Sequence, residues 1–193
     1  MKTEKQGVGA RERILDTAGR LFYRDGIRAV GVDTIVAEAS VAKMSLYRHF
    51  PSKDDLVVAY MERMHDEFWA WLAAQTAPYP DEPRRALEAI FEGVVRLAAS
   101  PQCLGCAFLG MAIEFPEADY PGHRLAIQHK LAVLERLAEL ATLAGARAPR
   151  ELAGQLLLLM DGVWGAVRVF GPGSHAADAV GAARTLIAAQ IPN

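Results

Sequence analysis

Residues 31–56 constrain the fold of this chain more than any other segment, because they have the pattern of two short helices, a tight turn and a new helix start. In the first part Ile35 and Ala39 share one helical face, and in the second Leu46 and Phe50 do the same. Helices of about seven residues are marginal alone, so these two must be held by packing on another helix.

A preceding helix can supply that support. It is predicted from about Ala10 to Arg24, where apolar residues form a one-sided stripe and arginines take the other faces. Asp25-Gly26 should end it, since glycine tolerates the left-handed conformation at a helix C-terminus. Three helices around a small core, with the third turned outward, define a helix-turn-helix, whose recognition helix enters the DNA major groove.

The outward face of the third helix is rich in hydrogen-bond donors. We expect base-edge contacts from Lys43, Ser45 and Arg48, phosphate contacts from Thr34, Tyr47, His49 and Lys53, and from Met44 either a thymine-methyl contact or a gap filled beside the turn. A solvated basic face that touches nothing is the alternative.

The next helix should begin at Lys53. Ser52 can cap it, with Asp55 three residues on completing a capping box and Pro51 blocking any backward extension. Lys53 then lies in the first helical turn, where the macrodipole disfavours a cation unless a phosphate lies close by.

A family resemblance is carried by these same residues. The segment from about Arg11 to Leu56, above all the run Leu46-Tyr-Arg-His-Phe-Pro-Ser-Lys53, resembles the DNA-binding domain of TetR-type transcriptional regulators. The resemblance implies an all-helical homodimer with a C-terminal domain that binds a small inducer and dimerises. Beyond residue 57, a Gly-Cys-x-Phe-Leu stretch and Glu114-Phe-Pro look like the sixth helix of one subgroup.

Two turn positions depart from the family pattern. Ser40 stands where glycine is usual, and it would be strained if the backbone there needs a positive φ. Ala42 stands where a serine often caps the recognition helix, and it forgoes a cap worth about 1 kcal/mol. We expect both to weaken the turn without removing a DNA-contacting side chain.

Charge supports a division into a DNA-binding domain at 1–53, with 1–9 as a disordered arm, and a ligand-binding and dimerisation domain at 54–193. Residues 1–53 hold ten Lys and Arg against six Asp and Glu, although the whole chain has a net charge of −2. A basic N-terminal part, called the head here (residues 1–53), and an acidic remainder fit a DNA-binding domain joined to one that does not bind DNA.

The remainder of the chain reads as helical, so the predicted fold class is all-α. Further helices are expected at about 53–77, 84–99, 106–115, 122–143, 150–170 and 175–190, divided by proline-rich or glycine-containing breaks. No secretory leader and no run of 18 uncharged apolar residues is found, so we expect a cytoplasmic protein that does not enter a membrane.

The last two long helices are the predicted dimer surface, because the first of them is apolar on nearly all faces. The expected interface residues are Leu156, Leu159, Val163, Val167, Ala183 and Ile187, packed against a twofold partner as a four-helix bundle. A monomer whose own core wraps this helix is the alternative.

Aromatic and methionine side chains of the C-terminal part could line a pocket for an apolar or aromatic inducer. The candidates are Trp69, Phe91, Phe108, Met111, Phe115, Met160 and Trp164. Ordinary core packing is the alternative for each of them.

Cys103 and Cys106 are spaced C-x-x-C. We expect two ordinary reduced thiols; a redox pair and a zinc site completed by His123 and His129 are the alternatives. No metal and no cofactor is therefore expected.

The predicted function is a sequence-specific DNA-binding regulator, a repressor that an apolar or aromatic ligand releases from a palindromic operator. An enzyme is the second class considered, but the chain contains no nucleophile elbow, phosphate-binding loop, dinucleotide fingerprint or zinc-protease motif. An adaptor that uses the helix-turn-helix for protein contacts is the third, and it predicts DNA binding with no preferred sequence.

Overall fold

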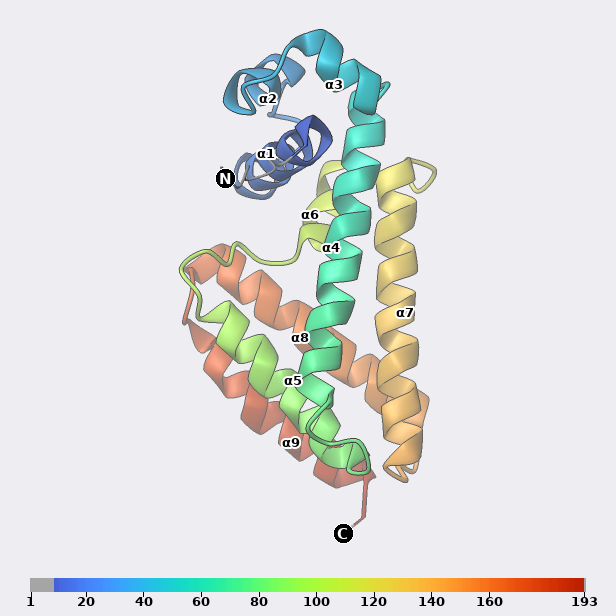
Figure 1. Ribbon diagram of the computed structural model, residues 1–193. Coiled ribbons are helices and arrows are strands. Elements are labelled where there is room, and N and C mark those ends of the chain that lie inside the picture. The colour runs from blue at the N-terminus through green and yellow to red at the C-terminus, as the bar shows by residue number, and fades with distance from the viewer. Residues whose placement is uncertain (1–8, 193) are drawn as a thin grey trace, which may run out of the picture. The chain divides into compact units, whose positions relative to one another are not determined.

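Helices joined by short loops make up the chain over residues 9–192, which this computed structural model describes and in which it places no strand (Figure 1). In chain order they are α1 (Ala10–Asp25), α2 (Val32–Glu38), α3 (Lys43–His49), α4 (Lys53–Thr76), α5 (Pro83–Ala98), α6 (Ala107–Glu114), α7 (Pro121–Leu143), α8 (Pro149–Phe170), the 3₁₀ turn η1 (His175–Ala177) and α9 (Asp178–Gln190). The all-α prediction is confirmed. The predicted arm falls outside the described residues, except for Gly9.

Proline and glycine set many of the helix ends. Pro83 and Pro149 begin α5 and α8, where a missing N–H has no cost and the fixed φ suits a helix. Gly171, at φ 85°, ends α8. Gly26 also has a positive φ, of 90°, but its ψ of 151° is extended, so it does not adopt the predicted left-handed helical conformation.

The described chain divides into two compact units. Unit 1 comprises residues up to 64 together with 108–125, and unit 2 comprises 65–107 and the residues from 126 onward. The chain passes from one unit to the other within α4, just after the start of α6, and within α7. Unit 1 therefore contains α1–α3 together with a segment that comes much later in the sequence.

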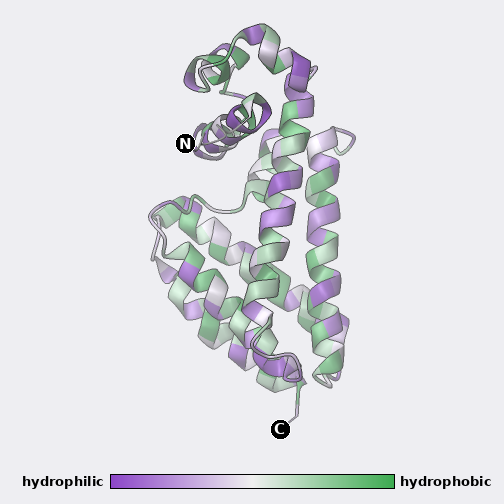
Figure 2. Ribbon diagram, in the orientation of Figure 1, coloured by the Kyte–Doolittle hydropathy of each residue, from purple (hydrophilic) through white to green (hydrophobic). Residues whose placement is uncertain are grey.

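The core of unit 1 is built from one face of each of its first helices. Ile14, Leu21, Ile35 and Leu46 are fully buried, and α1 packs against both α2 and α3. Figure 2 colours both hydrophobic and hydrophilic residues on α1, and its buried residues Ile14, Leu15, Ala18, Leu21 and Phe22 have the spacing of a one-sided helical stripe. The three-helix head predicted from the apolar spacing is the observed one.

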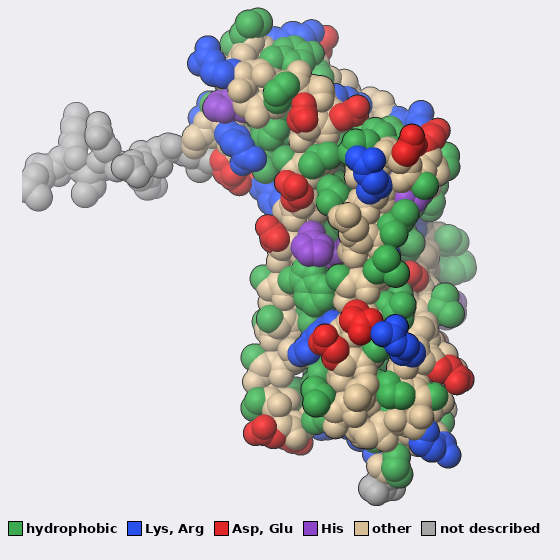
Figure 3. Space-filling view, turned by 90° about the vertical axis from the view of Figure 1, so that its right-hand side faces the viewer, with side chains coloured by type: hydrophobic (Ala, Val, Ile, Leu, Met, Phe, Trp, Pro, Cys, Tyr) green, Lys and Arg blue, Asp and Glu red, His purple; other side chains and the backbone are tan. Residues whose placement is uncertain are grey.

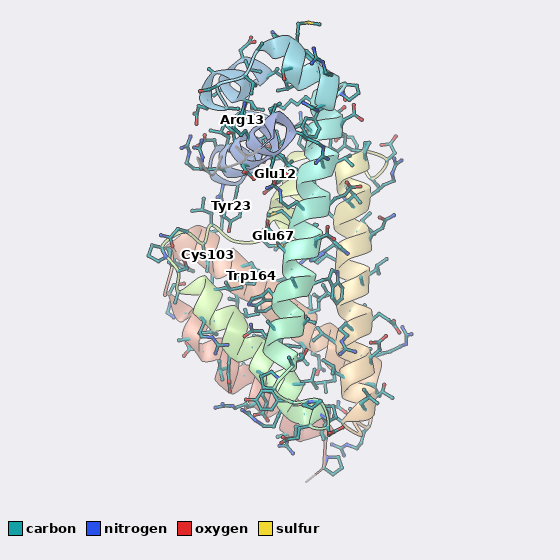
Figure 4. The ribbon with its side chains drawn as sticks, viewed as in Figure 1. Glu12, Arg13, Tyr23, Glu67, Cys103 and Trp164 are labelled. Atoms are coloured by element: carbon teal, nitrogen blue, oxygen red, sulfur yellow. The ribbon has the colours of Figure 1, made fainter. Side chains whose placement is uncertain are left out.

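Contacts of α4 with the loop before it and with α1 anchor it to this head. The predicted capping box is present: Ser52 Oγ accepts a hydrogen bond from the Asp55 N–H at 3.1 Å, and Asp55 Oδ2 accepts one from the Ser52 N–H at 2.9 Å. Arg63 forms ion pairs with Asp16 and with Glu12, which Figure 4 labels on α1, the latter at 3.2 Å.

Unit 2 is a helical packing of α5, α8 and α9, each of which contacts the other two. Phe91, Leu152 and Ala183 are among the residues buried completely there. By length and composition alone α8 could cross a membrane, which is weak support for a membrane span. Its buried stripe instead packs as a core helix does.

Candidate DNA-binding surface and ligand-binding unit

One face of α3 is buried and the other faces solvent. Leu46 is completely buried, whereas Met44 is 75% and Tyr47 39% exposed. Met44 therefore does not fill a gap beside the turn. On the face that Figure 3 draws, Lys and Arg side chains lie at the upper end, where Figure 1 places α2 and α3.

The other residues predicted to contact DNA differ in exposure. Those with exposed side chains are Thr34 on α2 and Lys43, Arg48 and His49 on α3, whereas Ser45 and Lys53 are half-buried. A helix with donors along its exposed face and its apolar residues on the core side has the arrangement that groove binding requires.

Lys43 has a partner within the head that the sequence did not reveal. Its Nζ lies 2.7 Å from Asp33 Oδ1, at the start of α2, and that hydrogen bond raises the pKa of Lys43. Both side chains are largely exposed. Exposed ion pairs contribute little net stability, so the ammonium can exchange Asp33 for a phosphate or a base.

The position of Lys53 also has an explanation within the chain. Its Nζ donates to the Ile27 carbonyl at 2.6 Å and lies 6.0 Å from the ring centroid of Phe22. Partial burial lowers the pKa of Lys53. The Ile27 carbonyl thus supplies the partner that the helix-dipole argument sought in a phosphate.

The turn between α2 and α3 is strained, as the sequence predicts for a non-glycine residue there. Ser40 has φ 51°, and it is the one non-glycine residue with a positive φ in the part of the chain that the structure describes. The N-cap of α3, Ala42, makes no side-chain capping bond. Both departures from the family pattern therefore weaken this turn.

We expect Ser40→Gly to raise the free energy of unfolding by about 0.5–1 kcal/mol, because glycine removes a Cβ clash larger than the entropy it adds to the unfolded chain. Urea unfolding measures the change. Ala37→Gly, at an exposed position within α2, is the matched control and should destabilise by about 1 kcal/mol. Equal destabilisation by both variants would contradict the strain at residue 40.

The residues predicted to line a ligand pocket are divided between the two units. Phe108, Met111 and Phe115 belong to unit 1, and Trp69, Phe91, Met160 and Trp164 belong to unit 2. Phe115 stacks on Tyr120 with ring centroids 4.3 Å apart, so its ring packs against another residue of unit 1. An open depression of about 400 Å³ lies in unit 2 and is lined by residues such as Glu135, Thr142 and Arg150, none of them a predicted pocket residue.

An imidazole–aromatic cluster in unit 2 was only partly foreseen. His129 on α7 is 2% exposed, and its Nδ1 lies 3.2 Å from Nδ1 of His65 on α4. Phe68 meets the His129 ring edge to face at 4.8 Å, and Trp69 lies 5.9 Å from the His65 ring. Burial lowers the pKa of His129 to about 3, so this imidazole is neutral at physiological pH.

His129 should make unit 2 sensitive to acid. The native pKa of about 3 lies below the ordinary 6.5, so between these values only the unfolded chain takes up the proton and stability falls as the pH falls. From pH 7 to pH 5 we expect wild type to lose about 1–2 kcal/mol more than His129→Asn, by urea unfolding. His175→Asn, at an exposed position, is the control and should follow wild type. Parallel pH curves for wild type and His129→Asn would contradict this assignment.

Most of the residues predicted to form the dimer interface lie in the core of unit 2 instead. Leu156, Val163, Val167, Ala183 and Ile187 are at most 3% exposed within the single chain, and Leu159 is half-buried. A side chain that is already buried adds no area to an interface. The apolar stripe thus packs on the chain's own α5 and α9, and the opposite face of α8 remains open, with Leu158 74% and Val169 73% exposed.

Cys103 and Cys106 are free, half-buried thiols in the loop between α5 and α6. Between them, Gly105 packs on α8, where a Cβ would lie 3.0 Å from the carbonyl oxygen of Trp164. Figure 4 labels Cys103 in this loop and Trp164 on α8. This close packing gives the loop a structural role in unit 2.

The three-helix head and the exposed donor face of α3 define a helix-turn-helix DNA-binding protein. Residues 14–60 match the model of the bacterial regulatory proteins of the tetR family. The crystal structure of SCO4454, a TetR-family transcriptional regulator from Streptomyces coelicolor, is 33% identical in sequence with a TM-score of 0.88, over 92% of this chain and 94% of that one. The chain belongs to the TetR family of transcriptional regulators and binds DNA.

Curated relatives agree in class. The regulator AcrR of Shigella flexneri is 26% identical over 127 residues, which cover 66% of this chain and 58% of AcrR. The transcriptional activator FasR of Mycolicibacterium smegmatis is 33% identical over 85 residues, which cover 42% of this chain and 39% of FasR. The chain therefore spans less than two thirds of each of these relatives.

Proposed function

We propose that this regulator acts as a homodimeric repressor, which occupies a pseudo-palindromic operator and is released by a small apolar or aromatic ligand. The observation that carries the proposal is the division of α3 into a buried face at Leu46 and an exposed face of donors. In this proposal residues 1–53 form the reading domain and residues 54–193 the ligand-binding and dimerisation domain, in a protein of the cytoplasm.

The proposed reading of DNA assigns a role to each exposed residue of the head. Arg48, Lys43 and Ser45 would contact base edges, and the exposed Met44 would meet a thymine methyl. Phosphates would be held by Thr34, Tyr47, His49 and Lys53. One α3 from each protomer would enter successive major grooves about one helical turn apart.

A second copy of this chain is the partner that we assign to the open face of α8 and α9. On α8 this face carries the exposed residues Leu158, Gly162, Gly165 and Val169, and Ala182 is exposed on the neighbouring α9. A Cβ at Gly162 or Gly165 would meet no atom within 4 Å, so a partner helix could approach closely there. Reading two half-sites requires two heads, and a twofold bundle of these helices supplies them.

The imidazole–aromatic cluster supports an uncharged ligand. Its aromatic members, Phe68 and Trp69, offer ring faces and edges. His129 is neutral and can replace its hydrogen bond to His65 with one to a ligand. Lys130 and Asp161 neutralise each other in an ion pair between α7 and α8. A charged ligand would therefore find no free opposite charge at these residues, whereas an aromatic ring with one hydroxyl would be satisfied.

In vitro transcription tests this proposal, with a promoter that carries the operator identified beforehand by selecting bound sequences from a random DNA pool. We expect the protein to lower transcript yield, and neutral aromatic compounds such as 2-naphthol to restore it, whereas the anion 2-naphthoate should not. Since FasR is an activator, increased transcription is the outcome that would contradict repression. Equal effects of the two compounds would contradict the uncharged-ligand assignment.

A further inference from the structure

The turn between α1 and α2 is held by a carboxylate that lies 86 residues later in the sequence. Within unit 1, Glu114 Oε1 accepts the Ile27 N–H at 3.1 Å, and Oε2 accepts the Arg28 N–H at 2.8 Å. Each carboxylate oxygen thus takes one backbone donor, which makes the pair of bonds charge-assisted. Glu114 is the last residue of α6, so this helix ends on the turn of the head.

Gly26 fits closely against the same carboxylate. A Cβ at Gly26 would lie 3.1 Å from Glu114 Oε1, and the residue's φ of 90° disfavours any side chain. The glycine that ends α1 therefore also makes room for Glu114. The sequence argument for Gly26 used only its role in ending the helix.

The side chain of Arg28 also contacts the end of α6 and the residue after it. Its Nε donates to the Glu114 carbonyl at 2.6 Å, and its guanidinium lies 4.5 Å from the ring centroid of Phe115. The Tyr120 ring stacks on Phe115, and the Tyr120 hydroxyl donates to Asp54 at 2.8 Å. The segment 114–120 is thereby joined both to the α1–α2 turn and to the start of α4.

We propose that Glu114 is a positioning residue for DNA binding: it holds the α1–α2 turn so that the head enters the groove in one fixed geometry, and it does not touch DNA. The inference rests on the proposed function, since it needs an operator that the head reads. The chain on both sides of segment 108–125 belongs to unit 2, so the segment that carries Glu114 is joined to unit 2 at both ends.

Glu114→Gln tests this role with almost no change in shape. An amide offers one oxygen and one NH₂ group, so one of the two backbone N–H groups would face a donor. By NMR hydrogen exchange of the dimeric protein we expect faster exchange at the Ile27 and Arg28 amides. We expect operator affinity to fall about threefold to tenfold, with an unchanged salt dependence because no phosphate contact is lost.

Glu117→Gln is the matched control, because it removes the same charge three residues away. Glu117 is exposed and approaches Arg28 only at 3.9 Å, with no bond to the turn backbone. If loss of negative charge were the whole effect, both variants would bind DNA more tightly, since DNA is an anion. A fall in affinity confined to Glu114→Gln therefore supports positioning, and equal or increased affinity in both overturns it.

Glu114→Asp keeps the charge and withdraws the carboxylate by one methylene. It is the second test variant, used if Glu114→Gln does not fold. The same loss of amide protection and of operator affinity is expected. Protected amides at residues 27 and 28 in both variants would show that Glu114 does not hold the α1–α2 turn and would overturn the proposal. Faster exchange at these amides together with wild-type affinity for the operator would overturn the positioning role and leave the proposed function standing. Failure of the wild-type protein to select an operator would count against the proposed function alone.

Discussion

Arg48→Ala should weaken operator binding by about 10- to 100-fold and relax the preference for one base pair in each half-site. Arg48 is exposed on α3 while Leu46 two positions earlier is buried, which directs this part of the helix outward. A guanidinium that contacts a guanine edge is worth about 1–3 kcal/mol of discrimination. Fluorescence anisotropy with the operator and with each single-base variant measures both effects.

Arg24→Ala is the control for lost charge, because Arg24 lies on α1 and is paired with Asp25. It should change the affinity for operator and random DNA alike, by a small factor. Equal loss of operator and random binding in Arg48→Ala would instead place Arg48 at a phosphate. Tyr47 and His49 would then have to be reconsidered as base contacts.

Gly162→Glu is expected to abolish dimers and to lower operator affinity by about 10²- to 10⁴-fold, since two linked heads gain that much over one. Gly162 lies on the open face of α8, and a Cβ there meets no atom within 4 Å, so the single chain should fold normally. Replacing glycine within a helix also favours the helix. Sedimentation equilibrium should give the 21.0 kDa of one chain instead of twice that mass.

Ala73→Glu provides the matched control, with the same added charge at an exposed position of α4. It should leave both the dimer and operator affinity unchanged. A dimeric Gly162→Glu protein that binds the operator normally would show that the protomers associate through another face.

The sequence predicted most helix ends because local chemistry decides them. The helices that begin at Pro83 and Pro149 were expected to begin one residue later, Gly171 follows the predicted end of α8, and Ser52 with Asp55 caps α4 as predicted. The strain at Ser40 was expected from the resemblance to the TetR family, in which glycine is usual at this turn position, and the positive φ of 51° agrees with that expectation. The η1 turn before α9 was not predicted, because apolar periodicity does not distinguish a 3₁₀ start from an α-helical one.

Long-range partners were the part that the sequence could not predict. Helical spacing shows that Leu156 and Val163 share an apolar stripe, but it does not tell whether the chain's own core or a partner covers that stripe. Glu114 carried no signal of its own either, beyond lying in the Glu-Phe-Pro stretch, because its two bonds reach residues far away in sequence. Lys43 and Asp33, ten residues apart, meet only once α2 and α3 are packed.

Selection of bound sequences from a random DNA pool tests the central claim most directly, that α3 reads a specific operator as part of a dimer. The selection is run with wild type and with a variant in which Lys43, Ser45 and Arg48 are all alanine. The account predicts an inverted repeat, with half-sites about one helical turn apart, that wild type enriches and the variant does not. Enrichment of the same repeat by the variant, or of no sequence by wild type, would contradict it.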